Sequence, residues 1–125
     1  MMILAPIALG ATGCAGGTEI RQVQAGGQRT FLSDATEQAQ STAHLEGTLE
    51  VGDGGCWLAR LPDDTTEVLV IWPQRTSVSE GHPALQLDGD EYSQGSPIAF
   101  GGGYREIAER EPAAECGAKE AFIIN

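Results

Sequence analysis

The sequence has little positive charge, few aromatic residues and a single asparagine. Seven Lys and Arg stand against 18 Asp and Glu, which gives a net charge of −11 at pH 7. Phosphate binding relies on clustered basic side chains, so this balance argues against nucleic acid as a partner. It argues equally against electrostatic attachment to an anionic membrane face. No Asn-x-Ser/Thr sequence occurs, which excludes the usual acceptor of N-linked glycans.

Side chains suited to catalysis are also scarce. The chain has two histidines, His44 and His82, and no serine in a Gly-x-Ser-x-Gly turn. A triad base would have to be one of these histidines, and His82 lies in a loop-like stretch beside Glu80. We therefore predict no catalytic residue, no cofactor and a protein that is not an enzyme. The alternative is a secreted hydrolase, or an enzyme accessory, that uses His82.

Metal-binding patterns are weak as well. Two isolated histidines and widely spaced cysteines do not match the spacing of zinc ligands. The stretch Asp88–Glu91 gathers three carboxylates, but an EF-hand loop would need glutamate at the position of Ala99. Because Asp-Gly between apolar flanks is a hairpin signal, we interpret this stretch as a turn and predict no metal site.

The N-terminal stretch from Met2 to Gly13 contains only apolar or small residues. As a helix it would span about 18 Å, which is too short to cross a bilayer. Pro6 and Gly10 would break it as a buried core helix. Its length and its small-residue end are typical of the apolar region of a signal peptide, which we predict over residues 1–13.

The end of that region, Ala11–Cys14 with the sequence ATGC, resembles the lipobox of bacterial lipoproteins. The resemblance implies cleavage after Gly13 and a diacylglyceryl group on Cys14. It also implies an extracytoplasmic protein of the cell envelope, attached to the cell membrane by its lipid anchor. The family prefers Leu where this chain has Ala11, and no Lys or Arg precedes Arg21. The alternative is an ordinary cysteine in an apolar N-terminus.

The cysteine count agrees with this resemblance. Three cysteines leave an odd one in an oxidising compartment, and acylation of Cys14 would leave Cys56 and Cys116 as a pair. We predict a structural disulfide between these two. It would close a loop of about 60 residues and contribute roughly 4 kcal/mol on the chain-entropy estimate.

The rest of the chain divides by composition at His44. Residues 14–43 are rich in Gly, Gln, Thr, Ser and Ala, and we predict a flexible tether in which Arg29–Leu32 could add a short edge strand. Residues 44–125 alternate between apolar runs and turn signals, which predicts a β-domain. The expected strands cover residues 44–51, 56–61, 66–72, 84–93 as a hairpin, 96–103, which ends in three glycines, and 119–125. Residues 104–115 could hold a helical turn or two, stopped by Pro112.

Five to six short antiparallel strands with one short helical insert favour a small all-β barrel, most like an OB-fold, with a β-sandwich as the alternative. The segments Gly47–Leu49, Asp53–Cys56, Ile71–Pro73 and Gly101–Gly103 with Cys116 resemble small Gly-rich lipoproteins of high-GC Gram-positive bacteria. The resemblance covers residues 47–124. It implies the fold and the compartment and gives no mechanism, because the role of those proteins is unknown.

The aromatic residues suggest where such a barrel would meet a partner. Trp57 and Trp72 have apolar neighbours and are expected in the core. Tyr92 and Tyr104 lie beside turns and are the candidates for a contact surface. With the acidic charge, that surface would suit a protein or a saccharide of the envelope, and not nucleic acid. We therefore expect a lipid-anchored envelope protein whose β-domain has an interaction or structural role.

Overall fold

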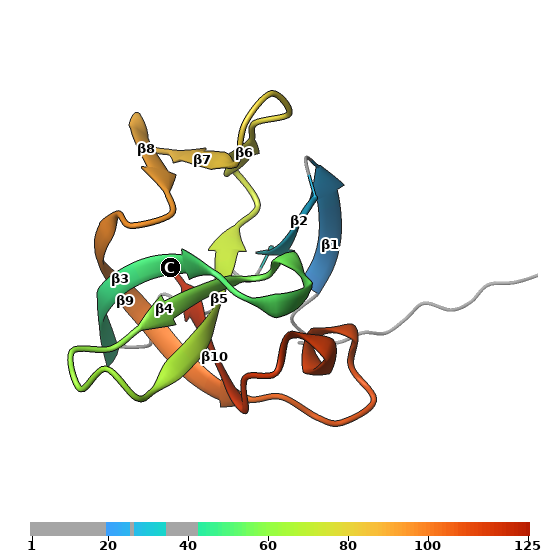
Figure 1. Ribbon diagram of the computed structural model, residues 1–125, viewed down its shortest axis with the longest axis vertical. Helices are drawn as coiled ribbons and strands as arrows, with labels where there is room; N and C mark the ends of the chain where they lie inside the picture. The colour runs from blue at the N-terminus through green and yellow to red at the C-terminus, as the bar shows by residue number, and fades with distance from the viewer. Residues whose placement is uncertain (1–19, 26, 35–42) are drawn as a thin grey trace, which may run out of the picture.

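The computed structural model describes residues 20–25, 27–34 and 43–125, and this part of the chain is all-β (Figure 1). Two short 3-10 turns, η3 (Asp53–Gly55) and η4 (Pro112–Cys116), lie between strands. The strands are β1 (Ile20–Ala25), β2 (Gln28–Ser33), β3 (Ala43–Val51), β4 (Trp57–Arg60), β5 (Glu67–Pro73), β6 (Ser77–Val78), β7 (Ala84–Leu87), β8 (Asp90–Ser93), β9 (Pro97–Glu106) and β10 (Glu120–Ile124).

Five of these strands close a small barrel, which confirms the predicted fold class. The barrel runs in the order β5, β10, β9, β3 and β4, and β4 returns to pair with β5. All neighbouring pairs are antiparallel except β5 and β10, which are parallel. The sequence predicted antiparallel strands throughout. The parallel pair arises because the last strand, β10, lies between β9 and β5.

The strands expected over residues 44–51, 56–61 and 66–72 are present as β3, β4 and β5, which form an antiparallel meander. The turn between β4 and β5 shows why the chain reverses there. Oδ1 of Asp63 accepts hydrogen bonds from the backbone N–H groups of Thr65 and Thr66, at 2.9 and 3.0 Å. These bonds lower the pKa of Asp63 to about 2, because they favour the charged carboxylate. The next residue, Asp64, has φ of 64°, a conformation that Asp tolerates better than most residues.

The turn predicted at Asp88–Gly89 joins β7 to β8. Both residues have positive φ, at 53° and 90°, as a two-residue hairpin turn requires. With β6, these two strands form a separate three-stranded sheet (Figure 1). Leu85 and Leu87 of this sheet are buried in the same apolar cluster as Trp72, so the small sheet packs on the barrel core.

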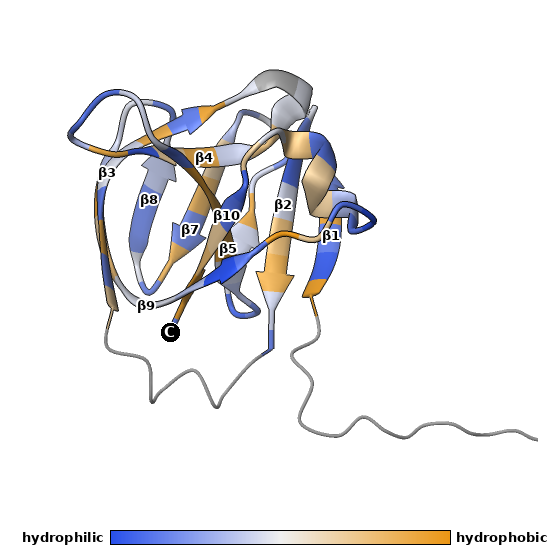
Figure 2. Cartoon of the chain, turned by 90° about the horizontal axis from the view of Figure 1, so that it is seen from below, coloured by the Kyte–Doolittle hydropathy of each residue, from blue (hydrophilic) through white to orange (hydrophobic). Residues whose placement is uncertain are grey.

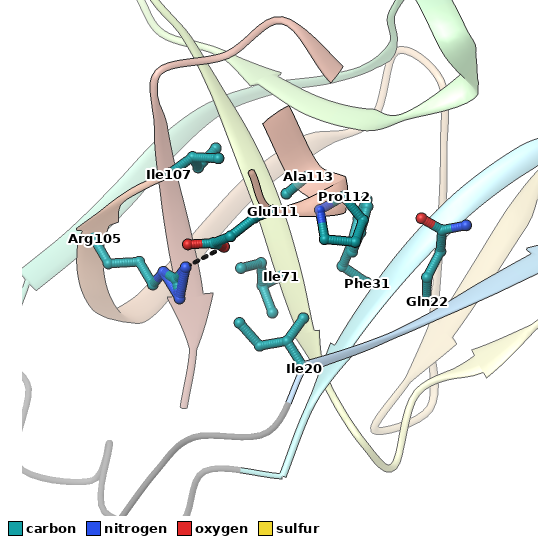
Figure 3. Close-up of a pocket in the computed structure, with 9 residues that line it drawn as sticks. All are labelled: Ile20, Gln22, Phe31, Ile71, Arg105, Ile107, Glu111, Pro112 and Ala113. Carbon is teal, nitrogen blue, oxygen red and sulfur yellow. Dashed lines mark hydrogen bonds and ion pairs between the residues drawn. The ribbon is translucent and has the colours of Figure 1, made fainter. Parts of the chain in front are cut away.

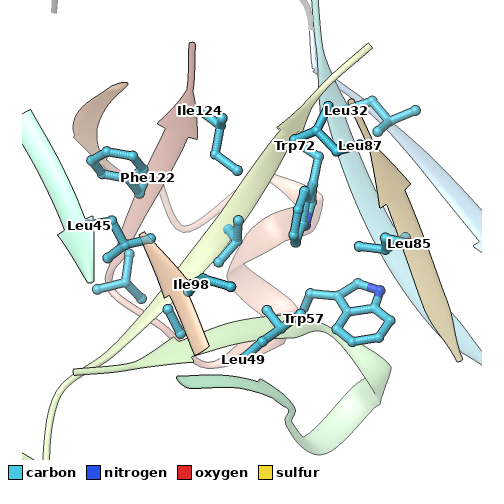
Figure 4. Close-up of a cluster of buried hydrophobic side chains, with 13 residues drawn as sticks. Leu32, Leu45, Leu49, Trp57, Trp72, Leu85, Leu87, Ile98, Phe122 and Ile124 are labelled. Carbon is cyan, nitrogen blue, oxygen red and sulfur yellow. The ribbon is translucent and has the colours of Figure 1, made fainter. Parts of the chain in front are cut away.

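The interior of the barrel is filled by one apolar cluster (Figure 4). Trp57 and Trp72 are 1 % and 0 % exposed, which confirms their prediction as core residues. Strand β5 alternates within a continuous apolar run: Val68, Val70 and Trp72 belong to this cluster. The residues between them face the other side of the sheet, so the strand is buried on both faces.

The β1–β2 hairpin corrects one prediction. Residues 14–43 were expected to form a flexible tether, but β1 and β2 pair with each other and β2 runs parallel to β5. Phe31 and Leu32 are buried on opposite faces of β2. Thr30, also buried, accepts a 3.1 Å hydrogen bond from Nε1 of Trp57. The tether prediction is therefore wrong for residues 20–25 and 27–34, because burial of β2 offsets its ordering entropy.

Strand β9 passes through the three consecutive glycines Gly101–Gly103 and continues to Glu106. It pairs with β3 up to Gly102 and with β10 from Gly102 onward. A Cβ atom on Gly102 would lie against the backbone carbonyl of Ile123, whereas one on Gly101 would meet only atoms 3.7 Å or more away. The middle glycine thus allows the close approach at which β9 exchanges one neighbour for the other.

The helical insert also differs from its prediction. It is the single 3-10 turn η4. Pro112 begins this turn, whereas the sequence predicted that Pro112 would end a helix. Proline suits the first position because its fixed φ fits a helix and its missing N–H would have no partner there. Gly117 ends the turn with φ of 87°.

Candidate apolar cleft and its surroundings

A second apolar cluster lies outside the barrel, between its wall and the segment that joins β9 to β10. Leu58, Leu69 and Ile71 project into it from β4 and β5, and Phe31 from the β1–β2 hairpin. Cys56, Ala113, Cys116, Ala121 and Ile123 complete the buried part of this cluster. It covers the outer face of β4 and β5, which would otherwise be an exposed apolar sheet.

Two cross-links fasten η4 over this face. Cys56 and Cys116 form a disulfide with a Cα–Cα distance of 5.7 Å, which confirms the predicted pair. Nη2 of Arg29 on β2 lies 2.8 Å from Oε1 of Glu115 on η4. Arg29 also forms an isolated parallel bridge with Cys56, so the hairpin, the start of β4 and η4 meet at one place.

An open cleft of about 370 Å³ remains on the same face, where η4 no longer covers it (Figure 3). Its volume lies at the lower end of the range for small-molecule pockets. Most of its walls are apolar side chains from the β1–β2 hairpin, from β5 and from the β9–β10 segment. They are Ile20 of β1, Phe31 of β2, Ile71 of β5, and Ile107, Pro112 and Ala113 of the β9–β10 segment.

The polar groups of the cleft lie on opposite sides. In Figure 3, Arg105 and Glu111 face each other on one side and Gln22 lies on the other. Nη2 of Arg105 donates to Oε1 of Glu111, and Oε2 of Glu111 accepts from the backbone N–H of Ala108 at 3.2 Å. The hydrogen bond from Arg105 lowers the pKa of Glu111, and burial opposes this shift only in part. The cleft therefore has apolar walls and a compensated ion pair.

The two tyrosines proposed as a contact surface have different surroundings. Tyr92 is half-buried and its ring lies 5.7 Å from Trp72 and 5.4 Å from Phe100. Tyr104 is 43 % exposed, and its ring lies 4.9 Å from that of Phe122. Burial raises the pKa of both hydroxyls. Neither tyrosine lines the cleft, and their role as a contact surface stays a prediction.

The surroundings of His82 do not resemble a hydrolase site. Its ring Nε2 is 3.3 Å from Oε2 of Glu91, and its side chain is 66 % exposed. A glutamate could orient the imidazole, but a catalytic base also needs a nucleophile in contact. A second carboxylate of the predicted turn, that of Asp88, accepts hydrogen bonds from both Nε and Nη2 of Arg75 at 2.9 Å. The described part of the chain contains no group of three or more potential metal ligands.

The remaining predicted site residue, Cys14, lies outside the described residues, as does the predicted signal peptide. No helix in the described ranges has the length and apolarity needed to cross a membrane. Comparison of the chain with family models, with curated proteins and with solved structures gives no match. The sequence did not predict the cleft, because most of its walls come from segments interpreted as a tether and as a helical insert.

Proposed function

We propose that the chain is a lipid-anchored, extracytoplasmic protein of the cell envelope, with a β-domain that is a non-catalytic interaction module. The observation that carries the location is the disulfide between Cys56 and Cys116. Structural disulfides persist in oxidising compartments and are rare in reducing ones. The observation agrees with the lipobox-like sequence that ends at Cys14.

The interaction role is supported by the position of the cleft on the barrel. OB-type barrels bind ligands on the face of their second and third strands and on two adjoining loops. Here β4 and β5 are the second and third barrel strands in chain order. The adjoining β3–β4 and β9–β10 loops are the two that the disulfide joins. The cleft is the part of this face that the chain leaves uncovered.

The anchor is tested by detergent-phase partitioning of the chain after expression in a bacterium that lipidates exported proteins. We expect the wild-type chain in the detergent phase and the Cys14→Ser variant in the aqueous phase. A diacylglyceryl group has two chains, which is enough for stable anchoring without basic residues. Gln86→Ala, at an exposed position of β7, should partition like the wild type. Mass spectrometry that finds an unmodified Met1 or Met2 on the exported chain would contradict the anchor.

The pairing of His82 with Glu91 supports the enzyme alternative, and one substitution separates the two functions. A non-catalytic module with His82→Ala should match the wild type in every binding measurement. A hydrolase would lose turnover of an activated ester such as p-nitrophenyl acetate. Turnover by the wild type that disappears in both His82→Ala and Glu91→Gln would favour the enzyme.

A further inference from the structure

Strand β1 is an edge strand, with no neighbour on its outer side among the residues that the structure describes. The seven-stranded sheet begins at β1, and the strand at its other end, β4, closes onto β5. Within the part of the chain that the structure describes, β1 is therefore the free edge of this sheet. Unpaired edges present backbone N–H and C=O groups that can pair with another extended segment.

The pairing of β1 with β2 shows which backbone groups face outward. A two-residue loop joins Ala25 to Gln28, and such a loop closes on a pair that exchanges both hydrogen bonds. Bonded and non-bonded pairs then alternate along an antiparallel ladder. The backbone groups of Ala25, Val23 and Arg21 thus face β2, whereas those of Ile20, Gln22 and Gln24 face outward.

The outer edge of β1 lacks the devices that usually prevent strand addition. Its sequence has no proline, its register with β2 is continuous over six residues, and Arg21 is its single charge. Proteins commonly block exposed edges with proline, bulges or several charges. Figure 2 shows β1 mostly hydrophilic beside the hydrophobic half of β2. Uncharged polar side chains can face water without preventing another strand from pairing with β1.

The free edge borders the cleft. Ile20 and Gln22, two of the residues with outward backbone groups, also line the cleft with their side chains. In an added strand, a residue opposite Gln22 would have its side chain on the same face of the sheet, about 5 Å away. That side chain would therefore lie at the mouth of the cleft, next to its apolar walls.

We propose that β1 binds an extended peptide segment of a partner protein, which adds a strand to the sheet and places one aliphatic side chain at the cleft. This deepens the interaction role proposed above by naming the kind of partner. In such binding, main-chain hydrogen bonds supply affinity and a side-chain pocket supplies specificity. The net charge of −11 favours a segment with basic residues beside the aliphatic one.

A second copy of this chain fits the edge less well than a basic peptide. Each copy carries a net charge of −11, so two copies repel as they approach. Antiparallel pairing of β1 with its counterpart about Gln22 would also place the Gln22 side chain of the second copy at the cleft, and an amide does not fill an apolar pocket. A dimer is therefore an outcome that the experiment must be able to detect.

The test uses the 15N-labelled full chain and the capped peptide Thr-Lys-Thr-Leu-Thr-Lys-Thr. Alternation in a strand puts the leucine and both lysines on one face and the threonines on the other. We expect titration to shift the amide signals of Ile20, Gln22 and Gln24. Replacing the leucine with alanine should weaken binding about tenfold, because part of the buried side chain is lost. Methylating the leucine backbone nitrogen should abolish binding, because it removes a ladder donor.

The matched protein variants are Gln24→Pro and Gln24→Ala. Gln24 does not line the cleft and its N–H faces outward, so proline is tolerated at this edge position but blocks an added strand. We expect Gln24→Pro to lose binding and Gln24→Ala to keep it. If Gln24→Pro fails to fold, the N-methylated peptide still decides.

Three results would overturn the proposal. They are equal affinity for the N-methylated peptide, no binding up to the solubility of the peptide, or a dimer that Gln24→Pro converts to a monomer. The measurement does not depend on the anchor. A chain that binds the peptide but is not lipidated would refute only the proposed location, and a lipidated chain that fails to bind would refute only this inference.

Discussion

Loss of the Cys56–Cys116 disulfide should destabilise the protein far more than an average substitution. Cys56 is fully buried and Cys116 is 5 % exposed, and both belong to the apolar cluster outside the barrel. The bond joins the residue before β4 to the last residue of η4, across a sequence separation of 60. Without it, η4 is held on this face by noncovalent contacts, among them the ion pair between Arg29 and Glu115.

The expected magnitude follows from the length of the closed loop. For about 60 residues, the chain-entropy relation gives roughly 4 kcal/mol of unfolding free energy at 25 °C. A domain of about 100 residues loses roughly 4 °C of melting temperature per kcal/mol, so reduction should lower Tm by about 15 °C or more. The surface ion pair offsets little of this, because such pairs contribute about 0–1 kcal/mol.

The assay compares urea and thermal unfolding of the full chain with and without reductant, in a Cys14→Ser background. In that background thiol titration should find no free thiol in the unfolded, non-reduced chain and two after reduction. The double Cys56→Ala and Cys116→Ala variant should match the reduced protein to within the cost of a small cavity. Two free thiols before reduction, or a stability difference below about 1 kcal/mol, would refute the reasoning.

Three further predictions concern single residues. Gly102→Ala should destabilise by about 2 kcal/mol or more because its Cβ meets a backbone carbonyl of β10, whereas Gly101→Ala should be mild, as urea unfolding would show. Asp63→Asn should reduce the acid-dependent part of stability. The folded pKa of about 2 lies below the usual value, so stability is present above about pH 4 and lost between pH 4 and 2. Thr30→Val should cost about 1–3 kcal/mol because it leaves Nε1 of Trp57 buried without an acceptor.

Each of these predictions has a control and a contradicting result. Asp64→Asn, next in the same turn, is the matched control, because it keeps a residue that tolerates positive φ and leaves the hydrogen bonds to the Asp63 carboxylate in place. Thr48→Val, at an exposed position of β3, should change stability by less than about 0.5 kcal/mol. The argument on Thr30 would be contradicted if Thr30→Val and Thr48→Val lowered the free energy of unfolding equally. The argument on Gly102 would be contradicted by equal losses for Gly102→Ala and Gly101→Ala. The argument on Asp63 would be contradicted if Asp63→Asn and the wild type lost stability in parallel at acid pH.

The barrel could be predicted from the sequence because its strands carry local signals. One strand is specified by the alternation of Leu45, Leu49 and Val51. Two chain reversals are specified by turn residues, at Pro62–Asp64 and at Asp88–Gly89. None of these signals depends on residues far away in the sequence. The disulfide was also predictable, because assigning Cys14 to the lipid left Cys56 and Cys116 as a pair. This argument did not require the exact path of the chain between the strands.

The β1–β2 hairpin and the cleft could not be predicted in the same way. The sequence of β1 has only Ile20 and Val23 as large apolar residues, and β2 has only Phe31 and Leu32. Composition alone is typical of a tether. The hairpin is ordered because β2 finds a neighbour in β5, about 40 residues away in the sequence, and this pairing has no local signal. The short apolar stretch at Phe31 was the one available indication.

The positions of the two tryptophans lead to a last prediction about the order in which the structure is lost. Both Trp57 and Trp72 belong to the cluster inside the barrel, whereas both disulfide cysteines belong to the cluster outside it. Because η4 supplies part of the cleft wall, reduction should loosen the outer cluster first. Hydrogen exchange of the amides in β1 and η4 should then accelerate in the reduced chain at low temperature, while tryptophan emission keeps its native maximum. If the tryptophan emission shifts at the same temperature at which exchange in β1 and η4 accelerates, the barrel and its outer cluster unfold as one unit and the prediction is wrong.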